Sequence, residues 1–132
     1  MRAGSAVFRS EAETHGGLSA MAHSGSGNLF AAGSAKGVLA VYDVRCLSSS
    51  LVTFRRNEAG IEDLCFVNLD GDGGLAVATS DGLPFVADAR SDEVKVVAEL
   101  AGVDCDPVRG VRVRGRDVWC ASDDAVVRKW CL

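Results

Sequence analysis

Short apolar runs alternate with turn residues along most of this chain. Residues Leu75 to Thr79 form an apolar run, the pair Asp81-Gly82 supplies turn chemistry, and a second apolar run begins at Phe85. Runs of about four to eight such residues, bounded by Gly, Asp or Ser, are typical of β-strands joined by tight turns. The pattern therefore predicts an all-β chain of short antiparallel strands.

A further pattern of large apolar residues precedes each of these strand pairs. The spacing found in residues 61–66 recurs in 108–113 and, less well, in 18–23. After the first two strand pairs comes another apolar run, at 51–54 and at 94–100. The predicted unit is therefore four short antiparallel strands in about 44 residues, which is the strand count and spacing of a propeller blade.

A sixteen-residue segment that occurs three times accounts for this regularity. Its copies occupy residues 30–45, 75–90 and 118–132, and the last copy is one residue shorter. A period of this size marks repeats that each form one supersecondary unit and bury their faces only against neighbours. We expect an N-terminal segment or outer strand at 1–14, followed by three units at 15–56, 57–100 and 101–132, the third lacking its outer strand.

The copies resemble the WD-repeat β-propeller family, in a divergent form, over roughly residues 15–132. They share its small residues, its turn Asp-Gly and its closing aromatic-Asp. The resemblance implies an incomplete propeller of about three four-stranded antiparallel blades. In that family a His, a Ser or Thr, a turn Asp and a Trp form a buried hydrogen-bonded tetrad in each blade. The residues at corresponding positions here are His15, Ser34, Tyr42, Thr79, Asp81, Ser122, Asp124 and Trp130.

No copy carries the complete tetrad. Lys36 stands at the acidic turn position of the first copy, and Ala87 replaces the aromatic residue of the second. The third copy has residues 104–106, Asp-Cys-Asp, where the family has Gly-His. Because buried polar groups need partners, incomplete tetrads predict weakened blades.

Two copies close on an Asp-x-Arg motif. It reads Tyr42-Asp43-Val44-Arg45 in the first copy and Asp88-Ala89-Arg90 in the second. The motif resembles the box by which certain propellers dock on the adaptor of cullin-4 ubiquitin ligases. The resemblance implies a protein partner, bound through Tyr42, Asp43, Arg45 and Arg90, where the planar guanidinium suits ion pairs. The alternative is that each Arg is simply an exposed residue after a strand.

Four arginines, at positions 109, 112, 114 and 116, follow one another closely. Alternation with Val111 and Val113 places Arg112 and Arg114 together on the opposite strand face. They are interpreted either as a basic patch for an acidic partner or phosphate, or as a solvated face lining the propeller channel. In the second interpretation local acids such as Asp104, Asp106 and Asp117 pair with them.

Composition narrows the setting of the protein. A net charge of −4 and a pI near 5.1 do not favour nucleic acid as the main partner. The apolar runs are short and interrupted, so no membrane-spanning segment is predicted. The five cysteines include no Cys-x-x-Cys pair, which favours a reducing compartment, the cytoplasm or the nucleus. No cofactor or metal is expected, because neither His lies at ligand spacing from a Cys.

Three blades are too few to close a ring, since propellers typically have about four to eight. The chain is therefore expected to be part of a larger propeller, to complete a ring with a second chain, or to form an open array. The predicted function is a non-catalytic interaction scaffold, such as a substrate receptor for a cullin-4 ubiquitin ligase. The alternatives are a scaffold subunit of a trafficking or RNA-processing assembly and an enzyme acting in the channel. For an enzyme, only His23, Arg112 and Arg114 are candidates, with no evident acid–base partner.

Overall fold

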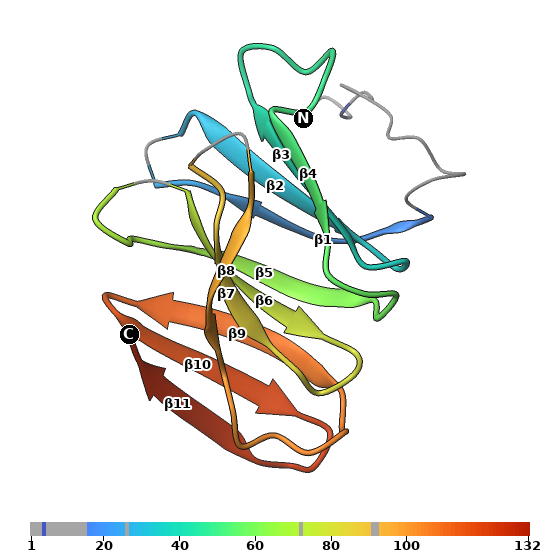
Figure 1. The fold of residues 1–132 in the computed structure, drawn as a ribbon, viewed down its shortest axis with the longest axis vertical. Coiled ribbons are helices and arrows are strands. Elements are labelled where there is room, and N and C mark those ends of the chain that lie inside the picture. The colour runs from blue at the N-terminus through green and yellow to red at the C-terminus, as the bar shows by residue number, and fades with distance from the viewer. Residues whose placement is uncertain (1–3, 5–15, 26, 72, 91–92) are drawn as a thin grey trace.

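The chain folds into three antiparallel sheets (Figure 1). The computed structural model describes residue 4 and residues 16–25, 27–71, 73–90 and 93–132. Sheet one contains β1 (Leu18–His23), β2 (Leu29–Ser34), β3 (Val38–Asp43) and β4 (Val52–Arg55). Sheet two contains β5 (Ile61–Val67), β6 (Gly74–Thr79), β7 (Phe85–Asp88) and β8 (Lys95–Glu99). Sheet three contains β9 (Val108–Arg114), β10 (Asp117–Ser122) and β11 (Val127–Cys131).

Each sheet is a meander in which strands that follow one another in the chain are paired. The first strands of the sheets lie side by side, because β1 packs beside β5 and β5 packs beside β9. Figure 1 shows sheet one at the top, sheet two in the middle and sheet three at the bottom. The sheets are therefore stacked in a blade-like manner. None of the described residues belongs to a helix long and apolar enough to span a membrane.

Sheet two lies between the other two, and its middle strands β6 and β7 are buried on both faces. Along β6, Leu75 and Val77 belong to the apolar cluster shared with sheet one, whereas Ala76 and Ala78 belong to the cluster shared with sheet three. Successive side chains of a strand point to opposite faces, so a strand covered on both sides is apolar throughout. This explains why all six residues of β6 are buried. Leu75 and Val77 face sheet one and the smaller Ala76 and Ala78 face sheet three. The size of these side chains limits how closely each neighbouring sheet can pack against β6.

In sheets one and two, the turn between the second and third strand faces the connector that leads to the next sheet. Gly37 and Gly82 occupy this turn with φ values of 80° and 75°. A Cβ atom at Gly37 would lie 2.4 Å from the carbonyl oxygen of Asn57, and one at Gly82 would lie 2.1 Å from that of Asp104. Glycine is therefore required both for backbone conformation and for space. Sheet three has Ala125 at the matching position, with φ 64°.

The strands expected from the apolar runs are confirmed. The three runs with common spacing form β1, β5 and β9, and the runs after the first two strand pairs form β4 and β8. Sheets one and two have four strands each, and sheet three has three within the described residues. The expected N-terminal segment 1–14 lies outside the described residues except for Gly4, and His15 lies outside them as well.

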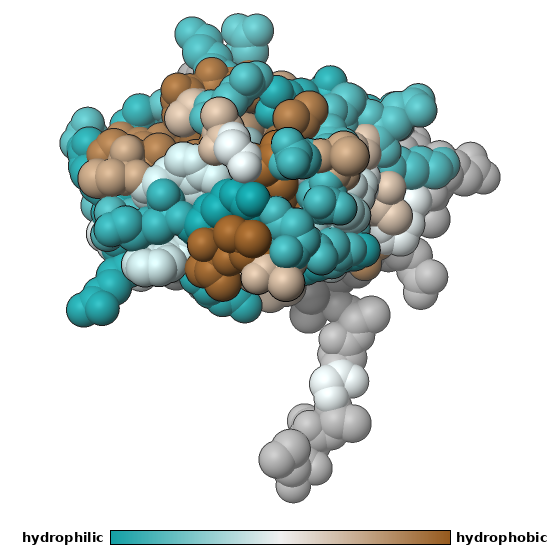
Figure 2. Space-filling view, turned by 90° about the horizontal axis from the view of Figure 1, so that it is seen from below, coloured by the Kyte–Doolittle hydropathy of each residue, from teal (hydrophilic) through white to brown (hydrophobic). Residues whose placement is uncertain are grey.

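The outward faces of sheets one and three keep apolar side chains at the surface. Met21 of β1 is exposed, as are Trp119 of β10 and Val127 of β11. The Nζ atom of Lys129 lies 5.6 Å from the centroid of the Trp119 ring, which places a cation over the aromatic face. Figure 2, a view of the molecule from below, shows apolar residues in separate groups among hydrophilic ones. In sheet two the exposed apolar side chains lie on the outer strand β8, at Val96 and Val97.

Candidate functional site

The two Asp-x-Arg motifs lie at the same edge of neighbouring sheets. Asp43 is the last residue of β3 and Asp88 is the last residue of β7. In the strand register Asp43 is opposite Leu29, and Asp88 is opposite Gly74. Both motifs therefore lie next to the turns that join the first and second strands of their sheets. We call this side of the molecule the motif edge.

The first motif forms a compact ion pair within itself. The backbone N–H and Nε of Arg45 both donate to Oδ1 of Asp43, at 2.9 Å each, and Nη2 donates to Oδ2 at 2.6 Å. The hydrogen bonds from the guanidinium, followed by that from the Arg45 N–H, lower the pKa of Asp43 to about 2. Both groups therefore stay charged at neutral pH. The Arg45 side chain is 71% exposed and that of Asp43 is 18% exposed.

Tyr42, the aromatic residue of the first motif, lies in the sheet. It is buried, and its ring stacks on that of Phe30 with centroids 5.0 Å apart. Successive residues of a strand point to opposite faces, so Tyr42 and Asp43 project in different directions. Of the residues expected to bind a partner in this motif, the structure places Arg45 at the surface and Tyr42 in the interior.

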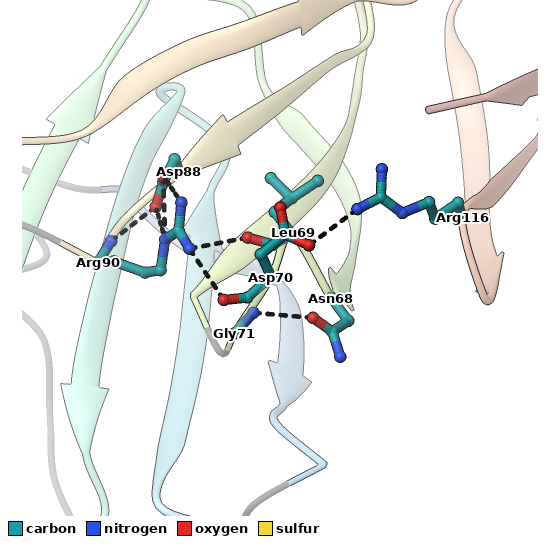
Figure 3. A network of polar contacts seen from close by, with 7 residues as sticks. All are labelled: Asn68, Leu69, Asp70, Gly71, Asp88, Arg90 and Arg116. Atoms are coloured by element: carbon teal, nitrogen blue, oxygen red, sulfur yellow. Dashed lines mark hydrogen bonds and ion pairs between the residues drawn. The ribbon is translucent and has the colours of Figure 1, made fainter.

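The second motif repeats this geometry and adds a second set of contacts (Figure 3). Arg90 donates from its backbone N–H and Nε to Oδ1 of Asp88, at 3.0 and 2.9 Å, and from Nη2 to Oδ2 at 2.6 Å. Its Nη1 donates to the carbonyl oxygens of Leu69 at 2.7 Å and Asp70 at 3.4 Å, both in the β5–β6 turn. The carboxylate of Asp70 in turn accepts a hydrogen bond of 3.0 Å from Arg116 of the β9–β10 turn. This network joins sheets two and three along the motif edge.

The tetrad-like residues of sheet two are brought together with a residue that the sequence did not single out. Oγ1 of Thr79 donates to Oδ1 of Asp81 at 2.6 Å, and the Leu83 N–H donates to the same oxygen at 3.1 Å. The amide nitrogen of Asn57 donates to Oδ2 of Asp81 at 3.0 Å. Asn57 lies in the connector before β5, so a side-chain amide from the preceding segment completes the cluster. An Asn-Glu pair in a connector gives no sequence signal for this role.

In sheet three an arginine takes part in place of the expected tryptophan. Ser122 donates to Oδ1 of Asp124, and Arg128 donates to Ser122 Oγ at 3.0 Å and to Oδ2 of Asp124 at 2.6 Å. These bonds, with that from Arg128 first, hold the pKa of Asp124 well below its usual range. The indole N–H of Trp130 instead donates to the carbonyl oxygen of Ala101 at 2.9 Å. Trp130 thus packs sheet three against the connector without bonding to Ser122.

In sheet one the described polar contacts of the β2–β3 turn centre on Ser34. The hydroxyl oxygen of Ser34 accepts hydrogen bonds from the backbone N–H groups of Lys36 at 3.3 Å and Val38 at 3.1 Å. Lys36 occupies the position where the other two sheets have an acid, and within the part of the chain that the structure describes these two bonds to Ser34 hold the β2–β3 turn. Within the described residues, every buried side-chain nitrogen and oxygen has a hydrogen-bond partner. Incomplete tetrads are therefore compensated by local substitutes.

The arginines of β9 pair with acids other than those expected. Arg112 donates to Oδ2 of Asp63 at 2.5 Å, and the same oxygen accepts the backbone N–H of Val111 at 2.9 Å. Arg109 pairs with Asp123 at 3.0 Å and with Glu62 at 3.2 Å. For Arg109 and Arg112, the expected partners Asp104, Asp106 and Asp117 are wrong. Their partners are acids of β5, the first strand of the neighbouring sheet, and an acid of the β10–β11 turn. Within the described residues, no three metal-ligating side chains gather at one point.

Asp81→Asn is expected to destabilise the chain by about 1 kcal/mol at pH 7. Burial opposes ionisation of Asp81, but the hydrogen bonds from Thr79, Leu83 and Asn57 outweigh it and keep the pKa of the carboxyl below its ordinary value of 3.8. A carboxyl whose pKa is lowered by folding stabilises the fold above its unfolded-state pKa. That contribution is lost as the pH falls through the folded-state pKa. Urea unfolding at pH 7 and pH 3 measures the difference.

The difference in unfolding free energy between wild type and Asp81→Asn should shrink at pH 3. Asp117→Asn is the matched control, because Asp117 lies 3.8 Å from Lys129 in a partly exposed pair. Such pairs contribute about 0–1 kcal/mol. An equal loss of stability for both variants at pH 7 would contradict the role assigned to Asp81.

No model of a known protein family matches this chain, and no curated protein matches it.

Proposed function

We propose that this protein is a non-catalytic interaction scaffold of WD-repeat type whose sheets are propeller blades. Three observations support this proposal: each sheet is an antiparallel meander, the first strands lie side by side, and the sheets share one period in the sequence. In a propeller the first strands line the central axis and the blades radiate outward. Residues 41–61 resemble WD repeat-containing protein 53 more closely than they resemble the generic repeat.

We further propose that the motif edge docks on the adaptor of cullin-4 ubiquitin ligases, which makes the protein a substrate receptor. The observation that carries this proposal is that the two Asp-x-Arg units have nearly the same hydrogen-bond geometry at the same edge of adjacent sheets. A guanidinium held by its own carboxylate is oriented before a partner arrives. Such orientation reduces the entropy cost of binding.

Arg45→Ala combined with Arg90→Ala is expected to weaken capture of the purified adaptor at least about tenfold, because it removes the guanidinium groups of both motifs and with them the charge-assisted hydrogen bonds that this edge can offer an acidic partner. Binding is measured by biolayer interferometry, and circular dichroism checks that the strands remain folded. The control removes two exposed cations of sheet three that lie outside the motifs, with Arg114→Ala and Lys129→Ala. If the double motif variant stays folded and binds as tightly as wild type, the docking mechanism is rejected.

A further inference from the structure

The two motif arginines are not equivalent in their surroundings. We propose that Arg45 is the arginine that contacts the adaptor, whereas Arg90 is a brace that fixes the β5–β6 turn and the junction of sheets two and three. This inference rests on the proposed function for the docking role of Arg45. The role of Arg90 as a brace stands on contacts within the chain.

All the nitrogens of the Arg90 guanidinium are engaged inside the molecule. Nε and Nη2 donate to Asp88, and Nη1 donates to the carbonyl oxygens of Leu69 and Asp70. The side chain is 42% exposed, which is well below the value for Arg45. A partner that drew the guanidinium outward would break its hydrogen bonds to two backbone carbonyl oxygens of the turn. Breaking these bonds costs free energy, so docking through Arg90 is disfavoured.

The β5–β6 turn is shaped around Arg90. Asp70 has φ 61°, a left-handed conformation that is uncommon for a residue with a side chain. Gly73 has φ 113°, and a Cβ atom there would lie 2.6 Å from Cγ of Arg90. The aliphatic part of Arg90 therefore packs directly on the turn backbone, while its guanidinium bonds to the turn carbonyls. The strained turn is held by this side chain from one side and by Arg116, through Asp70, from the other (Figure 3).

Arg45 has a different environment at the same position of sheet one. Its guanidinium donates to Asp43 through Nε and Nη2, and within the described residues Nη1 donates to no other group. The bidentate pair with Asp43 uses the edge of the guanidinium that carries Nε and Nη2. The opposite edge, which carries Nη1, points away from Asp43. A second carboxylate can approach there. In the same sheet, Leu51 immediately precedes β4, is 58% exposed, and donates its backbone N–H to the carbonyl oxygen of Val41 in β3.

The chemistry at Arg45 therefore suits an acidic side chain of the adaptor. Arg is preferred over Lys in such a position because its fork can serve two carboxylates at once. Sheet two offers no equivalent site, because the corresponding donors of Arg90 are already bonded to the turn. The docking contact is thus assigned to the edge of sheet one, with sheet two as its rigid neighbour.

Single variants separate the two roles. Arg45→Ala should weaken binding to the purified adaptor about tenfold or more and leave Tm unchanged within about 1 °C. Arg45→Lys should also weaken binding, because charge is kept while the fork is lost. Arg90→Ala should lower Tm by about 5 °C. It should also speed hydrogen exchange in residues 68–71, with binding at 10 °C reduced less than about threefold.

The outcomes distinguish this inference from the proposed function. If wild type does not bind the adaptor, the proposed function is rejected, and the docking role of Arg45 is rejected with it. If wild type binds but Arg90→Ala loses as much affinity as Arg45→Ala while still folded, the division of roles is overturned. If exchange in residues 68–71 is unchanged in Arg90→Ala, the brace is overturned, whatever the binding result.

Discussion

Gly82→Ala is expected to destabilise the chain by about 3 kcal/mol or more, the range of the most damaging single substitutions. Two costs add at this position. The residue has φ 75°, where a Cβ atom is disfavoured by about 1–2 kcal/mol. The added methyl group would also lie 2.1 Å from the carbonyl oxygen of Asp104 and 2.8 Å from that of Asp106. Because these are backbone atoms of the connector to sheet three, relief requires the sheets to move apart. Chemical unfolding monitored by tryptophan fluorescence measures the loss.

A matched control separates the steric cost from the backbone cost. Gly115 has φ 61°, and a methyl group added there would meet no heavy atom within 4 Å, so Gly115→Ala should cost only about 1–2 kcal/mol. Ala125→Gly is a second control, since it removes a side chain from a left-handed position in sheet three. It should be neutral or slightly stabilising. Equal losses for Gly82→Ala and Gly115→Ala would show that the connector does not press on this turn.

Asp63→Ala is expected to destabilise the chain by about 2 kcal/mol, because it leaves a polar group of the sheet two–three junction without a partner. Oδ2 of Asp63 accepts the backbone N–H of Val111, a fully buried residue of β9. It also accepts Nη1 of Arg112, whose side chain is exposed and contributes less. Most of the loss therefore comes from the orphaned backbone N–H. Equilibrium unfolding in urea at pH 7 gives the free energy.

Asp63→Asn tests this division of the effect. An amide oxygen can still accept the Val111 N–H, while the charge toward Arg112 is removed. We expect this variant to keep more than half of the stability that Asp63→Ala loses. A loss below about 0.5 kcal/mol for Asp63→Ala, the size typical of surface substitutions, would mean that the junction does not depend on this carboxylate.

The strands and turns could be predicted from the sequence because their signals are local. The run from Leu75 to Thr79 has apolar side chains on both faces, and β6 is found there, buried on both faces. Asp81-Gly82 marks the turn because only glycine adopts its backbone conformation without strain. The repeat then extends these assignments to sheets one and three.

The polar partners could not be predicted in the same way. Asn57 bonds to Asp81 across 24 residues, and Asp63 bonds to Val111 across 48 residues. Such pairs depend on how the sheets stack, which no local spacing encodes. The tetrad pattern also predicts that Trp130 takes part in the polar cluster of sheet three, whereas Arg128 is the residue that bonds to Asp124. Arg128 lies two positions before Trp130 in β11, so both side chains are on the same face of the strand. From there Arg128 reaches the β10–β11 turn.

Local patterns in the sequence are enough to predict a repeated array of short antiparallel strands, with an Asp-x-Arg motif closing two of the copies. Period-two alternation and left-handed turn positions are properties of a few consecutive residues, so they can be read directly. The different contacts of the two motif arginines arise only when the sheets stack. Nη1 of Arg90 donates to a carbonyl oxygen of the β5–β6 turn. Arg45 bonds to Asp43 through Nε and Nη2, and within the described residues its Nη1 donates to no other group. That difference arises from the path of a turn about twenty residues away, and the stacking of the sheets fixes it.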